Sequence, residues 1–125
     1  MRNMKIKNVT SLGKRLRKIR IDNDEITLNM AEKLGISISY LSAIEHGKRN
    51  IPNDFIQKLF DKYQLSEEMK TLIQKDVVDY SGEMKLIMSQ MNEQQQELSL
   101  LYARKINKLN DKQIKKMRRF LNGEE

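Results

Sequence analysis

Residues 27–46 contain two short stretches with the residue spacing of a helix, and a single glycine, Gly35, separates them. Within each stretch, apolar residues recur every three or four positions. These residues are Met30, Ala31, Leu34, Leu41 and Ile44. Gly35 can adopt the left-handed backbone conformation that ends a helix, and Ser37 can cap the next helix. The pattern therefore predicts two short helices, over 27–34 and from 37 to 45, that share a small apolar core.

A tight turn between two such helices is typical of the helix-turn-helix, whose second helix enters the major groove of DNA. Ala31 falls where the two helices would cross, and a larger side chain there would force them apart. His46 and Gly47 are expected to end the second helix, and a basic loop over 48–52 follows. The spacing and the basic loop together favour DNA binding over an ordinary helical bundle.

The remaining chain also shows helical spacing, so we expect an all-α protein. The expected helices are one over 11 to 20 or 21 capped by Ser11, one after Asn53 or Asp54, one after Ser66, one containing Leu98 to Ile106 after a polar run over 92–97, and one after Asn110 that Gly123 ends. Ser81 and Gly82 are expected to form a joint. Residues 84–91 fit both a helix and a strand, so their conformation stays open.

Composition excludes several other kinds of site. The chain of 125 residues has no cysteine and one histidine, His46, which rules out disulfides and the usual zinc sites. The sequence contains neither a Ser/His/Asp order nor a glycine-rich phosphate loop. A helix start and a solvated helix face explain the carboxylate pairs Glu67–Glu68 and Asp76–Asp79. We therefore expect no enzyme activity, no metal and no cofactor.

The formal net charge of +7 is unevenly distributed along the chain. Residues 1–52 hold 11 basic and 5 acidic side chains, residues 53–99 hold 5 and 9, and residues 100–125 hold 8 and 3. Two basic ends, at +6 and +5, therefore flank a middle part at −4, which favours an anionic partner. The sequence shows no signal peptide and no window with the ~18 apolar residues that span a bilayer. We expect a cytoplasmic protein with no membrane contact.

The basic stretch over 112–119 overlaps an apolar stripe near the end of the chain. The stripe consists of Ile114, Met117, Phe120 and Leu121. A helix of this kind can stabilise a dimer, bind a partner protein, add a nonspecific DNA contact or lie on a membrane surface. Because no lipidation signal or aromatic anchor supports the membrane role, the dimer or partner role is favoured.

The sequence resembles the Cro/CI-type, or XRE-family, transcriptional regulators of phages and bacteria over about residues 10–65. The matching segments are Leu12–Arg20, Met30–Ser37, Tyr40–Arg49 and Pro52. The resemblance implies a lambda-repressor-like helix-turn-helix bundle of four to five helices over 10–65 that binds operator DNA as a homodimer. The part over 66–123 resembles the helical C-terminal extension of some phage-type repressors from Gram-positive bacteria, which implies a role in dimerisation or partner binding.

The resemblance also implies roles for individual residues. The set implied to bind DNA is Thr27, Ile38, Ser39, Tyr40, Ser42, Ala43, Lys48, Arg49 and Asn50. In this set, Ser39 and Ser42 can hydrogen-bond to base edges, and Ile38 and Ala43 can contact thymine methyl groups. Thr27 and the loop residues correspond to phosphate contacts. Arg20 and Glu45 match a pair that forms an internal salt bridge, which implies a structural role.

One position departs from the family pattern, in which a serine or threonine directly before the second helix caps it. Here Ile26 holds that position, and Thr27 follows it. Either the helix starts one residue later with Thr27 as its cap, or Ile26 leaves it poorly capped at a cost of about 1 kcal/mol. A capping Thr27 would not be fully free to bind a phosphate.

Together, these features predict a sequence-specific repressor of a prophage or mobile element that binds a palindromic operator as a homodimer. An antirepressor or a protease is a possible further partner of the C-terminal extension. An alternative is an autoregulating antitoxin whose C-terminal half binds a toxin. A third class, nucleoid-associated or interaction proteins, would bind DNA without sequence preference.

Overall fold

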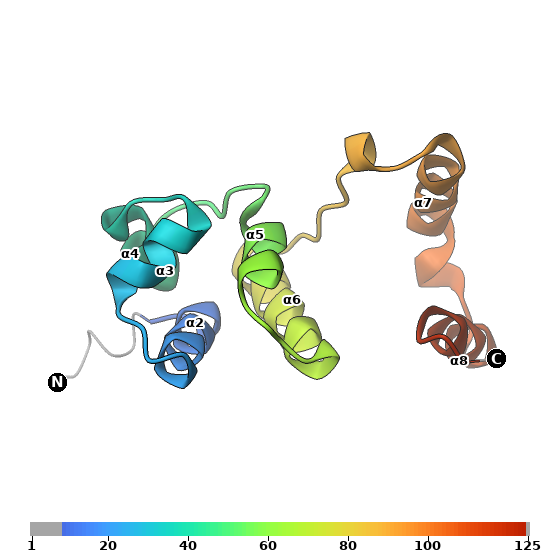
Figure 1. Cartoon of the computed structure of the whole chain (residues 1–125). Coiled ribbons are helices and arrows are strands. Elements are labelled where there is room, and N and C mark those ends of the chain that lie inside the picture. The colour runs from blue at the N-terminus through green and yellow to red at the C-terminus, as the bar shows by residue number, and fades with distance from the viewer. Residues whose placement is uncertain (1–8, 125) are drawn as a thin grey trace, which may run out of the picture. The chain divides into compact units, whose positions relative to one another are not determined.

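The computed structural model describes residues 9–124 (Figure 1). Over this range the chain forms seven α-helices, two short 3-10 helices and no strand. They are α2 (Ser11–Asp22), α3 (Thr27–Leu34), α4 (Ile38–Glu45), α5 (Phe55–Lys62), α6 (Glu67–Ser81), η1 (Met88–Gln90), α7 (Glu93–Lys105), η2 (Ile106–Lys108) and α8 (Asp111–Leu121). The predicted all-α class is therefore confirmed. The first eight residues, where no signal peptide was expected, lie outside the described range.

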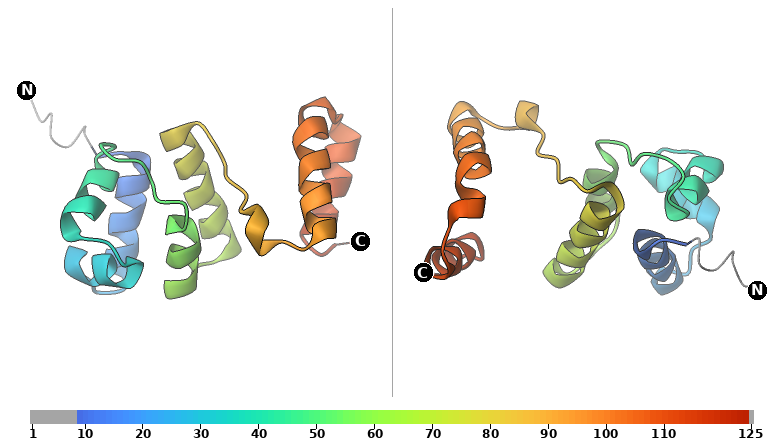
Figure 2. Two further views of the ribbon diagram at one scale, coloured as in Figure 1. Left: turned by 90° about the horizontal axis from the view of Figure 1, so that it is seen from above. Right: turned by 180° about the vertical axis from the view of Figure 1, so that it is seen from behind.

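The chain divides into two compact units, one ending at Lys85 and one beginning at Leu86. The first unit contains α2 to α6, which pack into a helical bundle around one apolar core (Figure 2). Its buried side chains are Leu12, Leu16, Ile19, Met30, Ala31, Leu34, Leu41, Ile44, Phe55, Leu59, Tyr63 and Ile73. Most of these residues lie three or four positions apart within their helices, and the predicted core residues Met30, Ala31, Leu34, Leu41 and Ile44 are confirmed among them.

The helix α6 packs with the first unit, although the expected helix-turn-helix domain ended at residue 65. Ile73 is fully buried, and the Arg15 guanidinium of α2 pairs with the Asp76 carboxylate of α6 at 2.8 Å. These contacts hold α2 and α6 side by side. Packing therefore places the break between units after Lys85, while the expected functional division into 10–65 and 66–123 stays a prediction.

Capping side chains set several helix ends as predicted. Those that accept a hydrogen bond from a first-turn N–H include Ser37, Ser66 and Asn110. The prediction that Ser11 caps α2 was wrong. Ser11 is already the first helical residue, and the Thr10 hydroxyl accepts from the Gly13 N–H at 3.0 Å. Asp54 precedes α5 as expected, but its side chain makes no capping bond.

Residues 84–91 form neither a full helix nor a strand. They follow an irregular path that ends in one 3-10 turn at Met88–Gln90. The next helix, α7, begins at Glu93, because Asn92 and Gln95 bond reciprocally to each other's backbone N–H groups as a capping box. The polar run over 92–97, expected to lead into the helix, therefore lies largely within it.

Candidate nucleic-acid interface

A tight turn at Gly35 joins α3 to α4. Gly35 has a φ of 69°, and the Ile36 N–H donates to the Ala31 carbonyl at 3.0 Å, a bond typical of a helix that ends in a left-handed residue. The Ser37 hydroxyl then accepts from the Tyr40 N–H at 3.0 Å and starts α4. Ala31 is buried in the core beside this turn. The α3–turn–α4 segment therefore has the geometry of a helix-turn-helix.

The helix α4 buries one face and exposes the other. Its buried apolar residues are Leu41 and Ile44. On the other side, Ile38 is 46% exposed and Ser39 is also exposed. Ser42 and Ala43 are half-buried. The outer side therefore presents hydroxyl and methyl groups, which are able to contact base edges and thymine methyl groups.

Residues of α2 and of its cap hold the last residue of α4, Glu45. The Glu45 carbonyl accepts from the N–H and the hydroxyl of Thr10, at 3.0 and 3.1 Å. The Glu45 carboxylate pairs with Arg20 at 2.5 Å and with Arg17 at 3.2 Å. Because Arg20 and Glu45 are only 7% and 3% exposed, this is a buried ion pair. It fixes the end of α4 against α2.

Gly13 permits this close approach of the two helices. A Cβ atom at Gly13 would lie 2.3 Å from the Glu45 carbonyl oxygen, far inside normal contact distance. Sequence reasoning missed the roles of Gly13, Thr10 and Arg17. The one available signal was Gly13 itself, since a glycine inside a helical pattern often has a packing reason.

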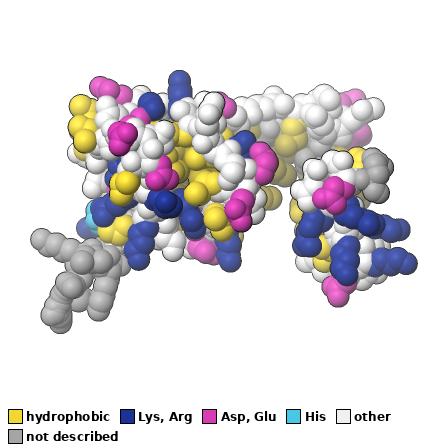
Figure 3. Space-filling view, turned by 60° about the horizontal axis from the view of Figure 1, so that its bottom comes forward, with side chains coloured by type: hydrophobic (Ala, Val, Ile, Leu, Met, Phe, Trp, Pro, Cys, Tyr) yellow, Lys and Arg dark blue, Asp and Glu magenta, His cyan; other side chains and the backbone are white. Residues whose placement is uncertain are grey.

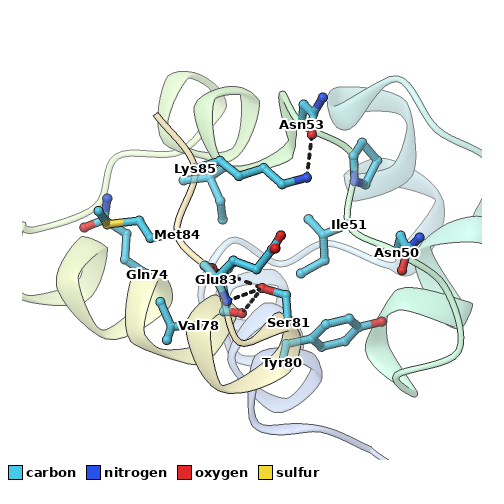
Figure 4. A pocket seen from close by; sticks show the side chains of 13 residues that line it. Asn50, Ile51, Asn53, Gln74, Val78, Tyr80, Ser81, Glu83, Met84 and Lys85 are labelled. Carbon is cyan, nitrogen blue, oxygen red and sulfur yellow. Dashed lines mark hydrogen bonds between the residues drawn. The ribbon is translucent and has the colours of Figure 1, made fainter. Parts of the chain in front are cut away.

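Two tyrosines, Tyr40 and Tyr80, hold the basic loop that follows α4, and Figure 4 shows Tyr80. Tyr40 of α4 donates its hydroxyl to the Asn50 carbonyl at 3.0 Å, and Tyr80 of α6 donates to the Arg49 carbonyl at 2.5 Å. The Arg49 guanidinium also lies 5.5 Å from the centre of the Tyr40 ring. Burial raises the pKa of the Tyr80 hydroxyl above its ordinary value. The residues Lys48, Arg49 and Asn50 remain exposed.

A cavity of about 530 Å³ adjoins the same loop, between α5 and the end of α6. At its edge, the Lys85 ammonium donates to the side-chain oxygen of Asn53 at 2.9 Å (Figure 4). Tyr80 thus ties the loop to α6, and Lys85, after α6, binds Asn53, the residue that follows the loop.

Thr27 is the first residue of α3, and Ile26 occupies the cap position. Ile26 has no side-chain acceptor to offer, but its N–H donates to the Asn29 side-chain oxygen at 2.8 Å. The structure therefore favours the alternative in which Ile26 precedes α3 and leaves it without an ordinary side-chain cap, over the one in which Thr27 caps a later start. Because Thr27 is not that cap, its half-buried hydroxyl is not committed to the helix start.

We also searched the described residues for a metal site and for a membrane-spanning helix. Across residues 9–124, no group of histidine and carboxylate side chains could hold a metal ion. In the same range, no helix is long and apolar enough to cross a membrane.

Comparison with known proteins adds one match. A family model described as a helix-turn-helix domain matches residues 13–78, which is more than half of the chain. The matched range contains the Gly35 turn, α4, the basic loop and most of α6. No curated protein and no solved structure matches the chain.

Proposed function

Since this chain belongs to the helix-turn-helix domain family and is a DNA-binding regulator, we propose that it binds a palindromic operator as a homodimer and represses genes of a prophage or mobile element. The observation that carries the proposal is the exposed side of α4, which is anchored at Glu45 and followed by an exposed basic loop. Such a repressor acts in the cytoplasm.

The proposed base contacts come from α4. Ser39 and Ser42 would donate to or accept from base edges, and Ile38 and Ala43 would contact thymine methyl groups. None of the four is long enough for the bidentate contacts that arginine, asparagine and glutamine make with purines. Discrimination between operators therefore depends more on methyl contacts, bridging water and DNA shape.

The proposed phosphate contacts come from the start of α3 and from the loop after α4. Thr27 offers a hydroxyl that does not cap its helix, and Lys48, Arg49 and Asn50 have exposed side chains. Tyr40 supports this group, because its ring faces the Arg49 guanidinium and its hydroxyl binds the loop backbone. Holding the loop in advance lowers the conformational entropy lost when it meets the DNA backbone.

Footprinting on the DNA upstream of the protein's own gene tests this proposal. We expect two protected half-sites about 34 Å apart, which is one helical turn. Ser39→Ala should change the ranking of operator variants, whereas Arg49→Ala should weaken binding to all of them. Equal affinity for the operator and for random DNA would contradict sequence-specific repression and favour a nucleoid-associated protein.

One observation favours the autoregulating antitoxin as a second candidate. Leu98, Phe120 and Leu121 of the C-terminal unit are 65–74% exposed and could pack against a toxin. If the adjacent gene encodes a toxin whose effect is suppressed by coexpression of this chain, the antitoxin is favoured. A divergently transcribed phage gene would favour the repressor, with an antirepressor or a protease as its further partner.

A further inference from the structure

The second unit has apolar faces but no core. Every described residue from 86 to 124 is at least partly exposed. The most exposed large apolar side chains of its helices are Leu98 at 65%, Leu100 at 60%, Leu101 at 43%, Phe120 at 74% and Leu121 at 73%. In the first unit, by contrast, α2 to α6 each contribute at least one fully buried apolar residue.

Local signals specify α7 and α8, and packing within the unit buries their apolar residues only in part. Asn92 with Gln95 and Asn110 with Gln113 form reciprocal capping boxes. The helices have only 13 and 11 residues, however, and isolated helices of this length are marginal in water. Both helices therefore need another surface against their apolar faces.

The two helices carry charges of opposite sign beside these faces. The first half of α7 contains Glu93 and Glu97, one turn apart, and no basic residue comes before Arg104. In α8, five basic residues accompany one acidic residue, Asp111. Figure 3 shows Lys and Arg side chains gathered on this unit beside apolar ones. Pairing α8 with its own copy, or α7 with its own copy in parallel, brings like charges together. Pairing the first half of α7 with α8 joins opposite charges.

We propose that a second copy of this chain covers these faces, with α8 of each protomer packed along α7 of the other and its basic residues beside Glu93 and Glu97. The proposal rests on the homodimer of the proposed function and assigns its interface to the C-terminal unit. The arrangement is two-fold symmetric, so the same α7–α8 contact occurs twice.

The available apolar surface is large enough for such a dimer. Ten large apolar side chains lie between Leu98 and Leu121. Five of them are exposed and offer roughly 100 Å² each, and the five half-buried ones offer less, so together they supply on the order of 600–800 Å² per protomer. A stable specific interface buries about 800 Å² per partner.

Sedimentation of the full chain in the absence of DNA tests whether the apolar faces of α7 and α8 form the dimer interface. We expect the wild type to be a dimer, and the combined change Leu98→Asp with Phe120→Asp to raise the dimer dissociation constant about tenfold or more. The matched control is Ile21→Asp on α2, because Ile21 is 72% exposed and Phe120 is 74% exposed. A monomeric wild type, or an equal loss in the control, would overturn the proposal.

Charge reversal tests which helices meet. Glu93→Lys with Glu97→Lys makes the first half of α7 basic. The combined change Lys115→Glu, Lys116→Glu, Arg118→Glu and Arg119→Glu makes α8 acidic, since only Lys112 then stays basic. Each variant alone should dimerise about tenfold more weakly, because both of its contacts then join like charges. An equimolar mixture should form a mixed dimer, in which both contacts join opposite charges. Unweakened single variants, or a mixture that stays monomeric, would overturn the α7–α8 pairing.

These measurements contain no DNA, so they separate the interface from the proposed function. A dimer that forms through another surface overturns the interface and leaves operator binding intact. A dimer that behaves as expected but leaves no footprint supports the interface and contradicts only the operator proposal.

Discussion

Glu45 receives the contacts that fix the end of α4. Its carbonyl accepts from Thr10 and its carboxylate pairs with Arg17 and Arg20. These partners precede it by 25 to 35 positions in the chain. Removing one side of a buried ion pair is costly, because the other charge stays buried without its partner. The position of α4 therefore depends on residues outside the predicted DNA-contact set.

Gly13 gives the first prediction. Gly13→Ala should lower the free energy of unfolding by about 1–3 kcal/mol, because the new Cβ would meet the Glu45 carbonyl oxygen at 2.3 Å. At an ordinary helix position the same change stabilises by roughly 0.5–1 kcal/mol. Urea unfolding measures the effect, with exposed Lys14→Ala at the next position as control. An unchanged or higher stability for Gly13→Ala would disprove the close approach.

Glu25 gives a prediction about pH. Its carboxylate pairs with the Lys33 ammonium at 2.5 Å and accepts from the Tyr63 hydroxyl at 2.6 Å. Burial alone would raise the pKa of Glu25, but these two bonds outweigh it and the pKa lies below its ordinary value of 4.5. The ionised carboxylate therefore stabilises the fold above that value, and the stabilisation is lost as the pH falls through the folded pKa.

Glu25→Gln should accordingly lower the free energy of unfolding most near neutral pH. In acid, where the wild-type carboxyl is also neutral, the two proteins should converge. Urea unfolding over a pH series measures the difference. A difference that stays constant down to low pH would show that ionisation of Glu25 does not stabilise the fold.

Tyr80 positions the loop without being in the predicted contact set. Tyr80→Phe removes its hydrogen bond to the Arg49 carbonyl in both protomers, and a net bond of about 1 kcal/mol in each corresponds to operator binding weaker by up to roughly 30-fold. In the control, Tyr63→Phe removes a hydroxyl that binds Glu25 instead of the loop. The control should lose stability but keep the operator affinity of the folded protein. Gel-shift titrations would refute the role of Tyr80 if its variant bound like the wild type.

The helices of the first unit could be predicted because their signals are local. Apolar spacing, Gly35 and the caps Ser37 and Ser66 act within one or two turns. The cap of α2 could not be predicted in the same way, since Thr10 and Ser11 are both able to cap. The choice of Thr10 involves a contact with Glu45, 35 positions away.

In the candidate site, too, features that depend on neighbouring residues could be predicted, and contacts between distant residues could not. The resemblance could place the predicted contact residues on α3, α4 and the loop, because it is a pattern of residues along the chain. It could not reveal that Tyr80 binds the loop or that Lys85 binds the next residue, Asn53, because these contacts span 31 and 32 positions. Residues 84–91 were ambiguous for a different reason, since their methionines, leucine and isoleucine fit two kinds of spacing and no cap or turn residue decides between them.

The contribution of α6 to the first unit can be tested at Ile73. Ile73→Ala should lower the free energy of unfolding by about 2–5 kcal/mol, because the side chain is fully buried in the core. Its neighbour Leu72 is 37% exposed, so Leu72→Ala should cost much less. Thermal or urea unfolding compares the two. Equal, small losses would mean that the bundle is complete without α6.

The two units have separate roles in the proposed protein. The first unit would read the operator through α4, and the second would hold two copies together through α7 and α8. In such a dimer, once the first unit of one protomer has bound its half-site, binding of the other protomer to the second half-site is intramolecular. This raises the affinity for the operator without any new contact to DNA. The basic and acidic parts of the chain then serve different interactions, because the charges of α7 and α8 act between protomers.

The salt dependence of operator binding tests the electrostatic part of this arrangement. A dimer that neutralises about 6–10 phosphates releases counterions, so its affinity should fall by about 10³–10⁵ between 50 and 200 mM salt. Arg49→Ala removes one proposed phosphate contact per protomer, which should reduce the slope of log affinity against log salt by about 2 per dimer. Exposed Lys62 on α5 lies outside the predicted contact set, so Lys62→Ala should leave the slope unchanged. Equal affinity at low and high salt would contradict the proposed phosphate contacts, and an equal slope change in both variants would contradict the role of Arg49.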